Sequence, residues 1–420
     1  MFYQYSKNYF WAWRGVLIAA HLQWHLYNYK IQKFYFIESA LVCLTLWLLI
    51  IILVVVNSDS FCNSSLLFLC IISLSLIVMA FFISNNLIYF YIFFELSILP
   101  IFLIIIVWGY QRERLFARLS ILLYTFMASL PLLFVLLLLN QKIRILTISN
   151  LNILLITQSP RRLWLSLSLL SAFLVKTPIY LTHMWLPKAH VEAPVFGSII
   201  LAAILLKMGT FGFIIIRALT NNYTFALIIT SLRAWAIIRV ALMCVKTVDI
   251  KVLVAYSSVS HIALLIILIF INSSLSNFRG GLIILSHGFT SSALFFRVNL
   301  MYEMSHSRST IFNKGVLYTP TYFFIWTLIL IRNIRAPPRI NFIAELIGVF
   351  ALINKNCLFL VTIFLFIVMT SLYSYLIFRV TAQLKSNTQK ILIIYKKNYL
   401  ILSSHIATVF LFTLNLTMLS

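Results

Sequence analysis

The sequence predicts an all-α polytopic membrane protein, and three observations support this fold class. Of its 420 residues, 63% are hydrophobic and only 10% are charged, and the mean hydropathy is +1.04. Soluble domains carry roughly 25% charged residues, so this class is excluded. The apolar runs are continuous and do not alternate, which favours helices over a β-barrel. Because a spanning helix needs about 20 apolar residues, we expect about 12–14 transmembrane helices.

The charge and the cysteines narrow the function. The net charge is +24, but the basic residues form no stripe with interleaved aromatic residues, so nucleic-acid binding is not expected. Positive charge beside apolar runs reports orientation and contact with anionic lipids, among which we expect cardiolipin. The cysteines lack paired ligand spacing, so no zinc or iron–sulfur site is expected on this chain. They are Cys43, Cys62, Cys70, Cys244 and Cys357.

The first three predicted helices span 35–56, 65–83 and about 87–107. The first two have no charged side chain in their interiors, and we expect them to be scaffold. The third has Glu95 near its centre, followed by Pro100. A carboxyl group at membrane depth is either satisfied by a neighbouring helix or carries protons, and we favour the proton carrier.

The stretch 172–217 is apolar except for a small set of ionisable side chains. The chain reaches it after a hydrophilic turn at 108–118, a helix at 119–139 and a re-entry at about residue 163. A charge near the bilayer centre costs from about 2.5 to more than 10 kcal/mol, so Lys176 is a functional candidate. Because Pro178 removes a backbone donor, we expect the helix to break there and to open a polar cavity around Lys176.

Two histidines and a second lysine follow in the same stretch. His183 and His190 are either proton relays or polar residues at the membrane interface, and the proline between them argues against one unbroken helix. Lys188 and Glu192 are expected at the membrane edge. Lys207 lies in the middle of a helix predicted at 196–217, too far from either end to snorkel. A lysine held there can switch between its charged and neutral forms.

Two later helices carry hydroxyl groups and histidines together. A helix at 224–245 and a charged turn at 246–251 precede the segment YSSVSH, whose hydroxyls we expect to line a hydrated path next to His261. SHGFTSS repeats this pattern around His287. One buried histidine is usually a satisfied core residue, but two on consecutive helices favour a chain of proton-passing groups.

The C-terminal part contains one further buried carboxyl group. A polar loop at 302–309 is followed by APPRINFIAELIGVF, in which Glu345 lies in an apolar run. Of the eight acidic residues, Glu95 and Glu345 lie deepest in apolar runs. Helices at about 357–378 and 391–416 contain no acidic residue, and we expect them to serve packing and subunit contact.

Three segments together resemble a known family: KTPIYLTHMWLPKAHVEAPVFGSIILAAILLKMGTFG, DIKVLVAYSSVSHIALL and LSHGFTSSALFF. They are similar to the antiporter-like membrane subunits of mitochondrial NADH:ubiquinone oxidoreductase, the respiratory complex I. Similar segments run in family order from about Glu95 to Tyr375. We therefore expect an N-terminal membrane region at 1–60, an antiporter-like proton-translocating core at 61–380 and a C-terminal transmembrane helix at 381–420.

The resemblance implies inverted repeats that each contribute one broken helix, here at Lys176 and Glu345. It also implies a proton path, with Lys176 keeping its charge while paired with Glu95 and releasing a proton toward Lys207 when the pair separates. The implied path residues are Glu95, Lys176, Lys207, His261, His287 and Glu345, with His183 and His190 as further relay candidates.

The resemblance further places this chain in a complex of the mitochondrial inner membrane, beside other membrane-arm subunits and above all neighbouring antiporter-like subunits. No glycine-rich nucleotide loop or cysteine cluster is found in the sequence. NADH, FMN, iron–sulfur clusters and ubiquinone are therefore expected on other subunits. Two other functions stay open: a subunit of a multi-chain Na⁺/H⁺ antiporter, and a structural membrane subunit with inert, paired charges.

Several arginines stand where the family has small or uncharged residues. Arg239 and Arg297 are the least expected, because they lie inside apolar helices without an obvious acidic partner. The arginines are either adaptations or the product of a translation table that reads AGA and AGG as arginine where the organelle reads serine, and we favour the second. The gene's codons decide this. The positions are Arg112, Arg118, Arg239, Arg297, Arg335, Arg339 and Arg379.

Overall fold

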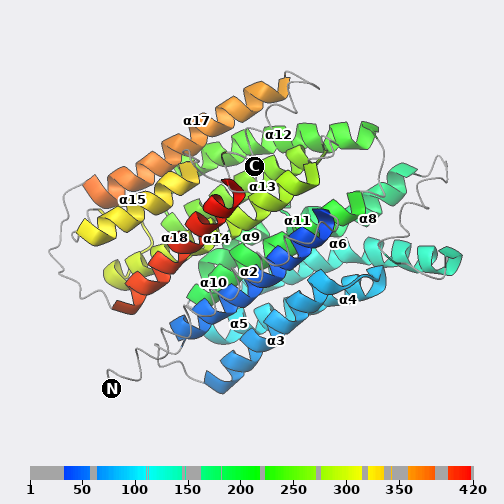
Figure 1. Cartoon of the computed structure of the whole chain (residues 1–420), viewed down its shortest axis with the longest axis horizontal. Helices are drawn as coiled ribbons and strands as arrows, with labels where there is room; N and C mark the ends of the chain where they lie inside the picture. Colours follow the sequence, from blue (N-terminus) through cyan, green and yellow to red (C-terminus); the bar gives the residue numbers. More distant parts are fainter. Residues whose placement is uncertain are drawn as a thin grey trace.

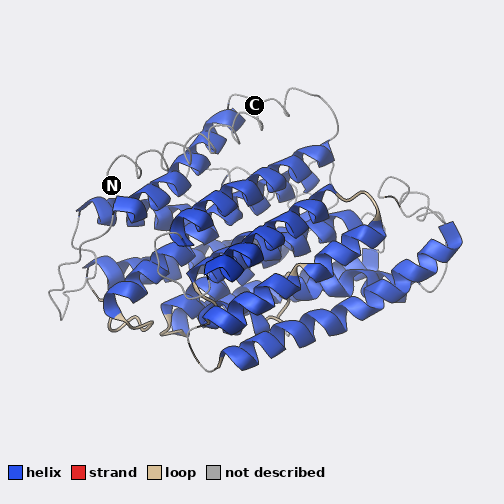
Figure 2. Ribbon diagram, turned by 90° about the horizontal axis from the view of Figure 1, so that it is seen from below, coloured by secondary structure: helices blue, strands red, loops and turns tan. Residues whose placement is uncertain are grey.

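The computed structural model of the chain is a bundle of long helices that lie roughly parallel or antiparallel (Figures 1 and 2). No strand occurs in the part of the chain that it describes. That part comprises residues 33–56, 64–109, 111, 113–143, 147, 162–180, 182–217, 223–270, 276–314, 320–334, 342, 358–383 and 396–417.

Within these residues, nine helices are long and apolar enough to cross a membrane, and 164–176 and 323–334 form shorter apolar helices. The all-α polytopic fold is confirmed, while the total of 12–14 helices stays a prediction. The elements are α2 (Lys33–Val56), α3 (Ser64–Ile83), α4 (Leu87–Leu96), α5 (Ile98–Trp108), α6 (Arg114–Ile143), α8 (Arg162–Lys176), α9 (Trp185–Glu192), α10 (Val195–Ile200), η2 (Leu201–Leu205), α11 (Leu206–Arg217), α12 (Tyr223–Lys246), α13 (Ile250–Phe270), α14 (Ser276–Ser305), α15 (Pro320–Ile334), α17 (Leu358–Phe378), η3 (Arg379–Gln383) and α18 (Lys396–Thr417).

Three of these spans are interrupted. α4 and α5 form one span with a break at Ser97, three residues before Pro100, whose ring removes a helix donor. α8 ends at Lys176, so the break predicted at Pro178 is confirmed. The span 195–217 contains η2, a π-helical segment between α10 and α11.

Two segments predicted as loops are partly helical. α6 begins at Arg114, within the turn predicted at 108–118, and the Arg114 side chain donates to the Gly109 carbonyl at 3.0 Å. α14 continues to Ser305, into the loop predicted at 302–309. Asn299 and Glu303 lie one helical turn apart and share a hydrogen bond of 2.6 Å, which supports this extension.

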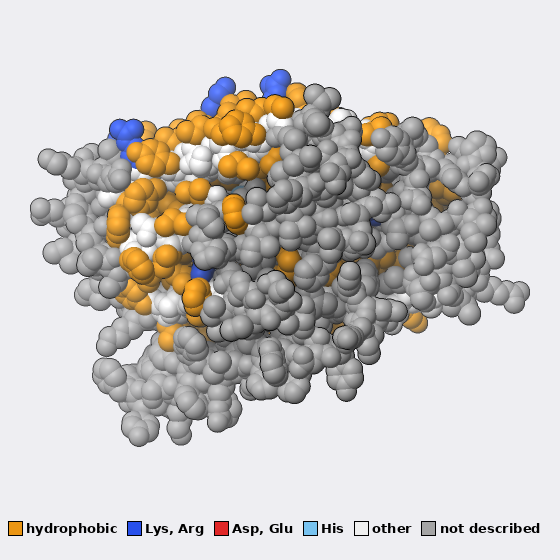
Figure 3. Space-filling view, turned by 45° about the horizontal axis from the view of Figure 1, so that its top comes forward, with side chains coloured by type: hydrophobic (Ala, Val, Ile, Leu, Met, Phe, Trp, Pro, Cys, Tyr) orange, Lys and Arg blue, Asp and Glu red, His pale blue; other side chains and the backbone are white. Residues whose placement is uncertain are grey.

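The core is formed by the span 195–217, which comprises α10, η2 and α11, together with α13 and α14. The apolar parts of the span 195–217 and of α14 are buried throughout, whereas most of the apolar part of α17 is not buried. The outward faces carry exposed apolar side chains, as expected for contact with lipid or other subunits; Figure 3 shows one such face, where the described side chains are mostly hydrophobic. The path residues predicted on α11, α13 and α14 therefore lie in the interior.

The C-terminal helix is joined to the core by a buried guanidinium. Arg332 of α15 donates to the carbonyls of His405 and Ile406 in α18, at 3.1 and 2.6 Å. α18 also packs on α14. The expected three-region division at 1–60, 61–380 and 381–420 stays a prediction.

The buried indole of Trp326 gives a test of the packing between α15 and η3. Its Nε1 donates to the Thr381 hydroxyl at 2.9 Å. Thr381→Val keeps the shape but leaves a buried donor unpaired, which we expect to lower stability by about 1–3 kcal/mol. Thr381→Ser keeps the hydroxyl and is the matched control. Equal thermal unfolding temperatures for the two variants in detergent would contradict this role.

Candidate functional site

Lys176 lies at the end of α8 and is 3% exposed. Its ammonium donates to the Phe94 carbonyl at 2.7 Å and lies 3.4 Å from the Ser97 hydroxyl, at the break between α4 and α5. The same ammonium lies 3.3 Å from the centroid of the Phe94 ring, within cation–π distance. The lysine therefore joins two helix breaks that are far apart in the sequence.

Glu95 is half-buried on α4 and interacts electrostatically with Lys176. No direct ion pair joins these two described residues, because the Lys176 ammonium donates to the Phe94 carbonyl instead. Ser129 of α6 hydrogen-bonds the Glu95 carboxyl group, and Glu95 Oε1 has no hydrogen-bond partner among the described residues. The predicted pair therefore interacts electrostatically but forms no ion pair.

A cluster of phenylalanine rings extends from Phe94, whose ring contacts the Lys176 ammonium. Phe94 lies 4.9 Å from Phe173 and 6.0 Å from Phe81 between ring centroids, and Phe81 stacks on Phe90 at 4.2 Å. Phe211 of α11 closes the cluster at 6.1 Å from Phe81. α3, predicted as scaffold, therefore contributes part of the apolar wall beside the buried ammonium.

Lys207 follows the π-helical segment directly and is 2% exposed. Its ammonium donates to the Ala202 carbonyl, within that segment, and lies 2.9 Å from His287 Nδ1 of α14. π-helical turns inside α-helices are frequent at functional sites, because they redirect backbone carbonyls. Lys207 thus lies in the middle of the span 195–217, as predicted, and the structure adds its contact with His287.

The histidine pair continues from Lys207 toward α17. The rings of His287 and His261 lie 5.4 Å apart, and His261 Nε2 lies 3.2 Å from the Tyr373 hydroxyl. The serines beside His261 donate to carbonyls of their own helix, such as Ser257 to Val254 at 2.7 Å. They are buried, so only their remaining lone pairs could contribute to the hydrated path that the sequence predicts.

His183 and His190 occupy separate elements, as the proline between them predicts. His183 precedes α9, and its ring stacks on Tyr180 at 5.2 Å and lies 6.0 Å from Tyr256. His190 lies within α9, is fully buried and stacks on Phe295 of α14 at 4.3 Å and 8°. Both rings are buried in the protein, and the choice between a proton relay and an interfacial residue stays a prediction.

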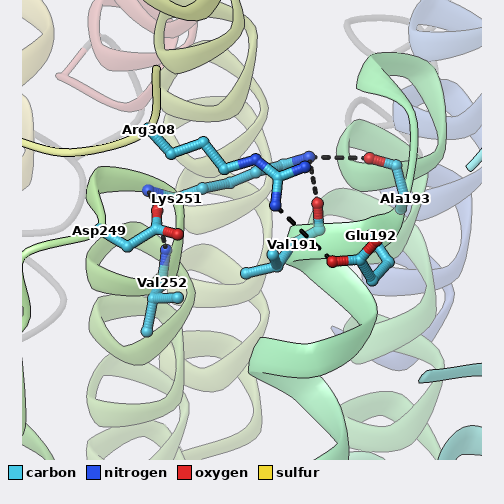
Figure 4. A network of polar contacts seen from close by, with 7 residues as sticks. All are labelled: Val191, Glu192, Ala193, Asp249, Lys251, Val252 and Arg308. Atoms are coloured by element: carbon cyan, nitrogen blue, oxygen red, sulfur yellow. Dashed lines mark hydrogen bonds and ion pairs between the residues drawn. The ribbon is translucent and has the colours of Figure 1, made fainter. Parts of the chain in front are cut away.

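Of the two residues predicted at the membrane edge, Lys188 is exposed and Glu192 is buried in the protein. Glu192 forms an ion pair of 3.6 Å with Arg308, the one ion pair found among the described residues. Lys251 and Asp249 lie beside it (Figure 4). Glu345 lies outside the described residues, so its place at the end of the path stays a prediction.

The structure adds two residues that sequence reasoning missed. Tyr373 is one of 20 tyrosines in an apolar chain, and no local pattern marks its contact with His261. Arg233 is fully buried in α12 and donates to the carbonyls of Thr177 and Pro178 at 2.8 and 3.2 Å, at the break after Lys176. Both contacts join residues more than 50 positions apart.

The unexpected arginines lie in different surroundings. Arg239 lies within helix α12, as predicted, and is exposed, 4.7 Å from the Trp235 ring. Arg297 is fully buried, 5.4 Å from the Trp326 ring. Arg118 lies 5.2 Å from the Phe102 ring, and Arg379 is exposed. Arg112, Arg335 and Arg339 lie outside the described residues. The codon hypothesis stays open.

Comparison with known proteins places the chain among membrane transport proteins. Residues 84–414 match the family model described as NADH:quinone oxidoreductase/Mrp antiporter, TM. NADH-ubiquinone oxidoreductase chain 4 of Albinaria caerulea is 40% identical over 321 residues, which cover 74% of this chain and 71% of the relative.

Two solved structures share the fold at low sequence identity. A chain of respiratory complex I from Thermus thermophilus with bound NADH superposes with a TM-score of 0.78 and 20% identity, over 90% of this chain and 79% of that chain. A chain of the membrane-bound sulfane sulfur reductase, an archaeal respiratory membrane complex, gives a TM-score of 0.84 and 12% identity, over 98% and 89%.

Gly209 allows α11 to approach the end of α8 at the first buried lysine. A methyl group there would lie 2.8 Å from Thr177 Cγ2 and 3.0 Å from Lys176 Cβ. Because backbone atoms of Thr177 follow closely, we expect Gly209→Ala to lower stability by about 1–3 kcal/mol.

The matched control is Gly280→Ala, where the added methyl would meet side-chain atoms only, the nearest being Ile269 Cγ1 at 3.2 Å. It gains helix propensity of up to about 1 kcal/mol. Thermal unfolding of both variants checks the prediction, which fails if Gly209→Ala is the more stable.

Proposed function

The chain belongs to the NADH:quinone oxidoreductase/Mrp antiporter family of transmembrane proteins, and we propose that it is the proton-translocating subunit 4 of a respiratory NADH:ubiquinone oxidoreductase. In this proposal electron transfer from NADH to quinone takes place on other subunits. This chain moves protons across the membrane in response.

One observation supports the proposal most directly: the buried Lys207 ammonium lies 2.9 Å from His287. A proton-transfer pair must lie within about 2.6–3.2 Å, and both groups can bind or release a proton. His261 and the Tyr373 hydroxyl extend this pair toward α17. The buried groups thus form a row in which each member can pass a proton on.

The proposed cycle begins at Lys176. While Glu95 is close, its negative charge holds the proton on Lys176; when the two separate, burial favours the neutral lysine and the proton leaves toward Lys207. Lys207 then passes a proton through His287 and His261, and Glu345 ends the path. His183 and His190 are further relays in this proposal. The electrostatic interaction between Glu95 and Lys176, which form no ion pair in the structure, supports this proposal.

The remaining assignments follow from the relatives. We place the chain in the mitochondrial inner membrane, next to other membrane-arm subunits and lipids that include cardiolipin. NADH, FMN, iron–sulfur clusters and ubiquinone belong to other subunits. The named relative, an NADH-ubiquinone oxidoreductase chain 4, favours this role over a Na⁺/H⁺ antiporter subunit. Replacement of sodium by potassium in a pumping assay separates these two functions, since only the antiporter role requires sodium.

Lys176→Ala tests the central residue. In a genetically tractable relative, we expect the variant to lose at least about tenfold in NADH-driven proton pumping, since a positioned proton-transfer group is typically worth 10²–10⁴-fold. Pumping is measured in sealed membranes together with quinone reduction and the amount of assembled complex.

Lys188→Ala is the matched control, because it removes an exposed lysine of the neighbouring helix α9. It should pump at the wild-type rate. Full pumping by assembled Lys176→Ala complex would make Lys176 structural and refute the proposed cycle.

Tyr373→Phe tests the extension of the path beyond His261. Loss of one hydrogen bond of about 0.5–1.5 kcal/mol should slow proton pumping by up to roughly tenfold. Tyr375→Phe on the same helix removes an exposed hydroxyl and serves as control. If both variants pump equally fast, Tyr373 has no part in the path.

A further inference from the structure

The C-terminal end of α9 is held by a lysine from another helix. Lys251, near the start of α13, donates to the carbonyls of Val191 and Ala193 at 3.1 and 2.8 Å (Figure 4). The last carbonyls of a helix lack partners within the helix, and a cation there also meets the negative end of the helix dipole. Lys251 is 8% exposed, so water competes little for these contacts. Lys251 therefore fixes the end of α9.

A second contact holds the same end of α9. Arg308, in the loop after α14, pairs with Glu192 at 3.6 Å, and the two side chains are 14% and 4% exposed. Removal of one partner of such a pair leaves a buried charge without compensation, so the pair resists separation. Lys251 and Arg308 thus contact three successive residues, 191–193, from two directions (Figure 4).

The loop that carries Arg308 is itself tied to the start of α13. The Ile250 amide donates to the Arg308 carbonyl at 3.0 Å, and the Thr310 amide donates to the Val248 carbonyl at 2.8 Å. Asp249 accepts from the Lys251 amide at 2.8 Å, which caps α13. Consequently Arg308 and Lys251 belong to one hydrogen-bonded unit that contacts the C-terminal end of α9.

The helix held in this way carries His190. Its ring lies flat against Phe295, and both ring nitrogens are buried without a hydrogen-bond partner among the described residues. Lys207 and Lys251 are the charged groups that act on it electrostatically. Glu192 lies only two residues after His190 in the short helix α9. A shift of the C-terminal end of α9 would therefore move His190 relative to both lysines.

We propose that Arg308, Glu192 and Lys251 form a clamp that sets the position of His190 against Phe295, and that they are positioning residues for proton transfer. The inference rests on the proposed function and deepens it, because it assigns a role to three charged residues outside the path of buried lysines. The clamp passes no proton itself. It acts through the place that it gives to the unpartnered imidazole.

The test compares clamp variants with and without His190 in assembled complex. Arg308→Gln and Glu192→Gln each remove one charge of the pair, and Arg308→Lys keeps the charge. Each is made alone and with His190→Phe, which keeps a ring against Phe295 but removes both nitrogens. The readouts are the proton-pumping rate per assembled complex and the amount of assembled complex.

With His190 present, Arg308→Gln and Glu192→Gln should each slow pumping by about fivefold. A variant that carries both substitutions should be no slower than either single one, because all three lose the same interaction. Arg308→Lys should recover at least half of the rate. In the His190→Phe background, Arg308→Gln should change the remaining rate by less than about twofold. If Arg308→Gln does not assemble, Glu192→Gln and Arg308→Lys provide the same comparison.

Other outcomes would overturn the clamp. One is an equal loss with and without His190; another is a loss of assembled complex at an unchanged rate per complex; a third is normal pumping by His190→Phe alone. Lys176→Ala, measured in parallel, distinguishes a failure of the clamp from a failure of the proposed function. If it stops pumping while the clamp variants pump normally, only the clamp is wrong; if it pumps normally, the proposed function fails.

Discussion

Four buried cations in this bundle donate to backbone carbonyls at helix interruptions or helix ends. Lys176 donates to a carbonyl at the break between α4 and α5, Lys207 to one within the π-helical segment η2, and Lys251 to two at the end of α9. Arg233 donates to the carbonyls released where α8 ends. In an apolar medium an isolated charge and an unpaired carbonyl are each unfavourable, and their combination removes both penalties.

This pairing explains why the positions of the charges and the breaks depend on each other. A carbonyl in the middle of a continuous helix already accepts from an amide of its own helix, whereas a break leaves carbonyls without such a donor. A buried ammonium can use those carbonyls, and the break in turn gains a donor. Contacts of this kind leave the ammonium groups free of a fixed carboxylate partner. Protonation can then respond to a distant or moving charge such as Glu95, which a direct ion pair would suppress.

The sequence predicted the parts of this arrangement that local chemistry determines. Pro178 indicated the break beside Lys176, and the length of the apolar run indicated the depth of Lys207. It could not predict η2, because LAAIL contains neither proline nor glycine, nor the contact of Tyr373 with His261, which depends on packing between distant helices. The burial of Glu192 was missed for the same reason: its partner, Arg308, lies on a loop 116 positions later (308 − 192).

The phenylalanine cluster beside Lys176 has a consequence for signalling over distance. Water weakens electric fields through a dielectric constant of about 80, whereas protein interiors behave nearer to about 20 or below. The Phe94 ring lies 3.3 Å from the ammonium and packs against Phe173, so the side of the ammonium that faces these rings is apolar. The electric field of a charge change at Lys176 is therefore weakened less by the surroundings than it would be in water, and it reaches the neighbouring helices more strongly.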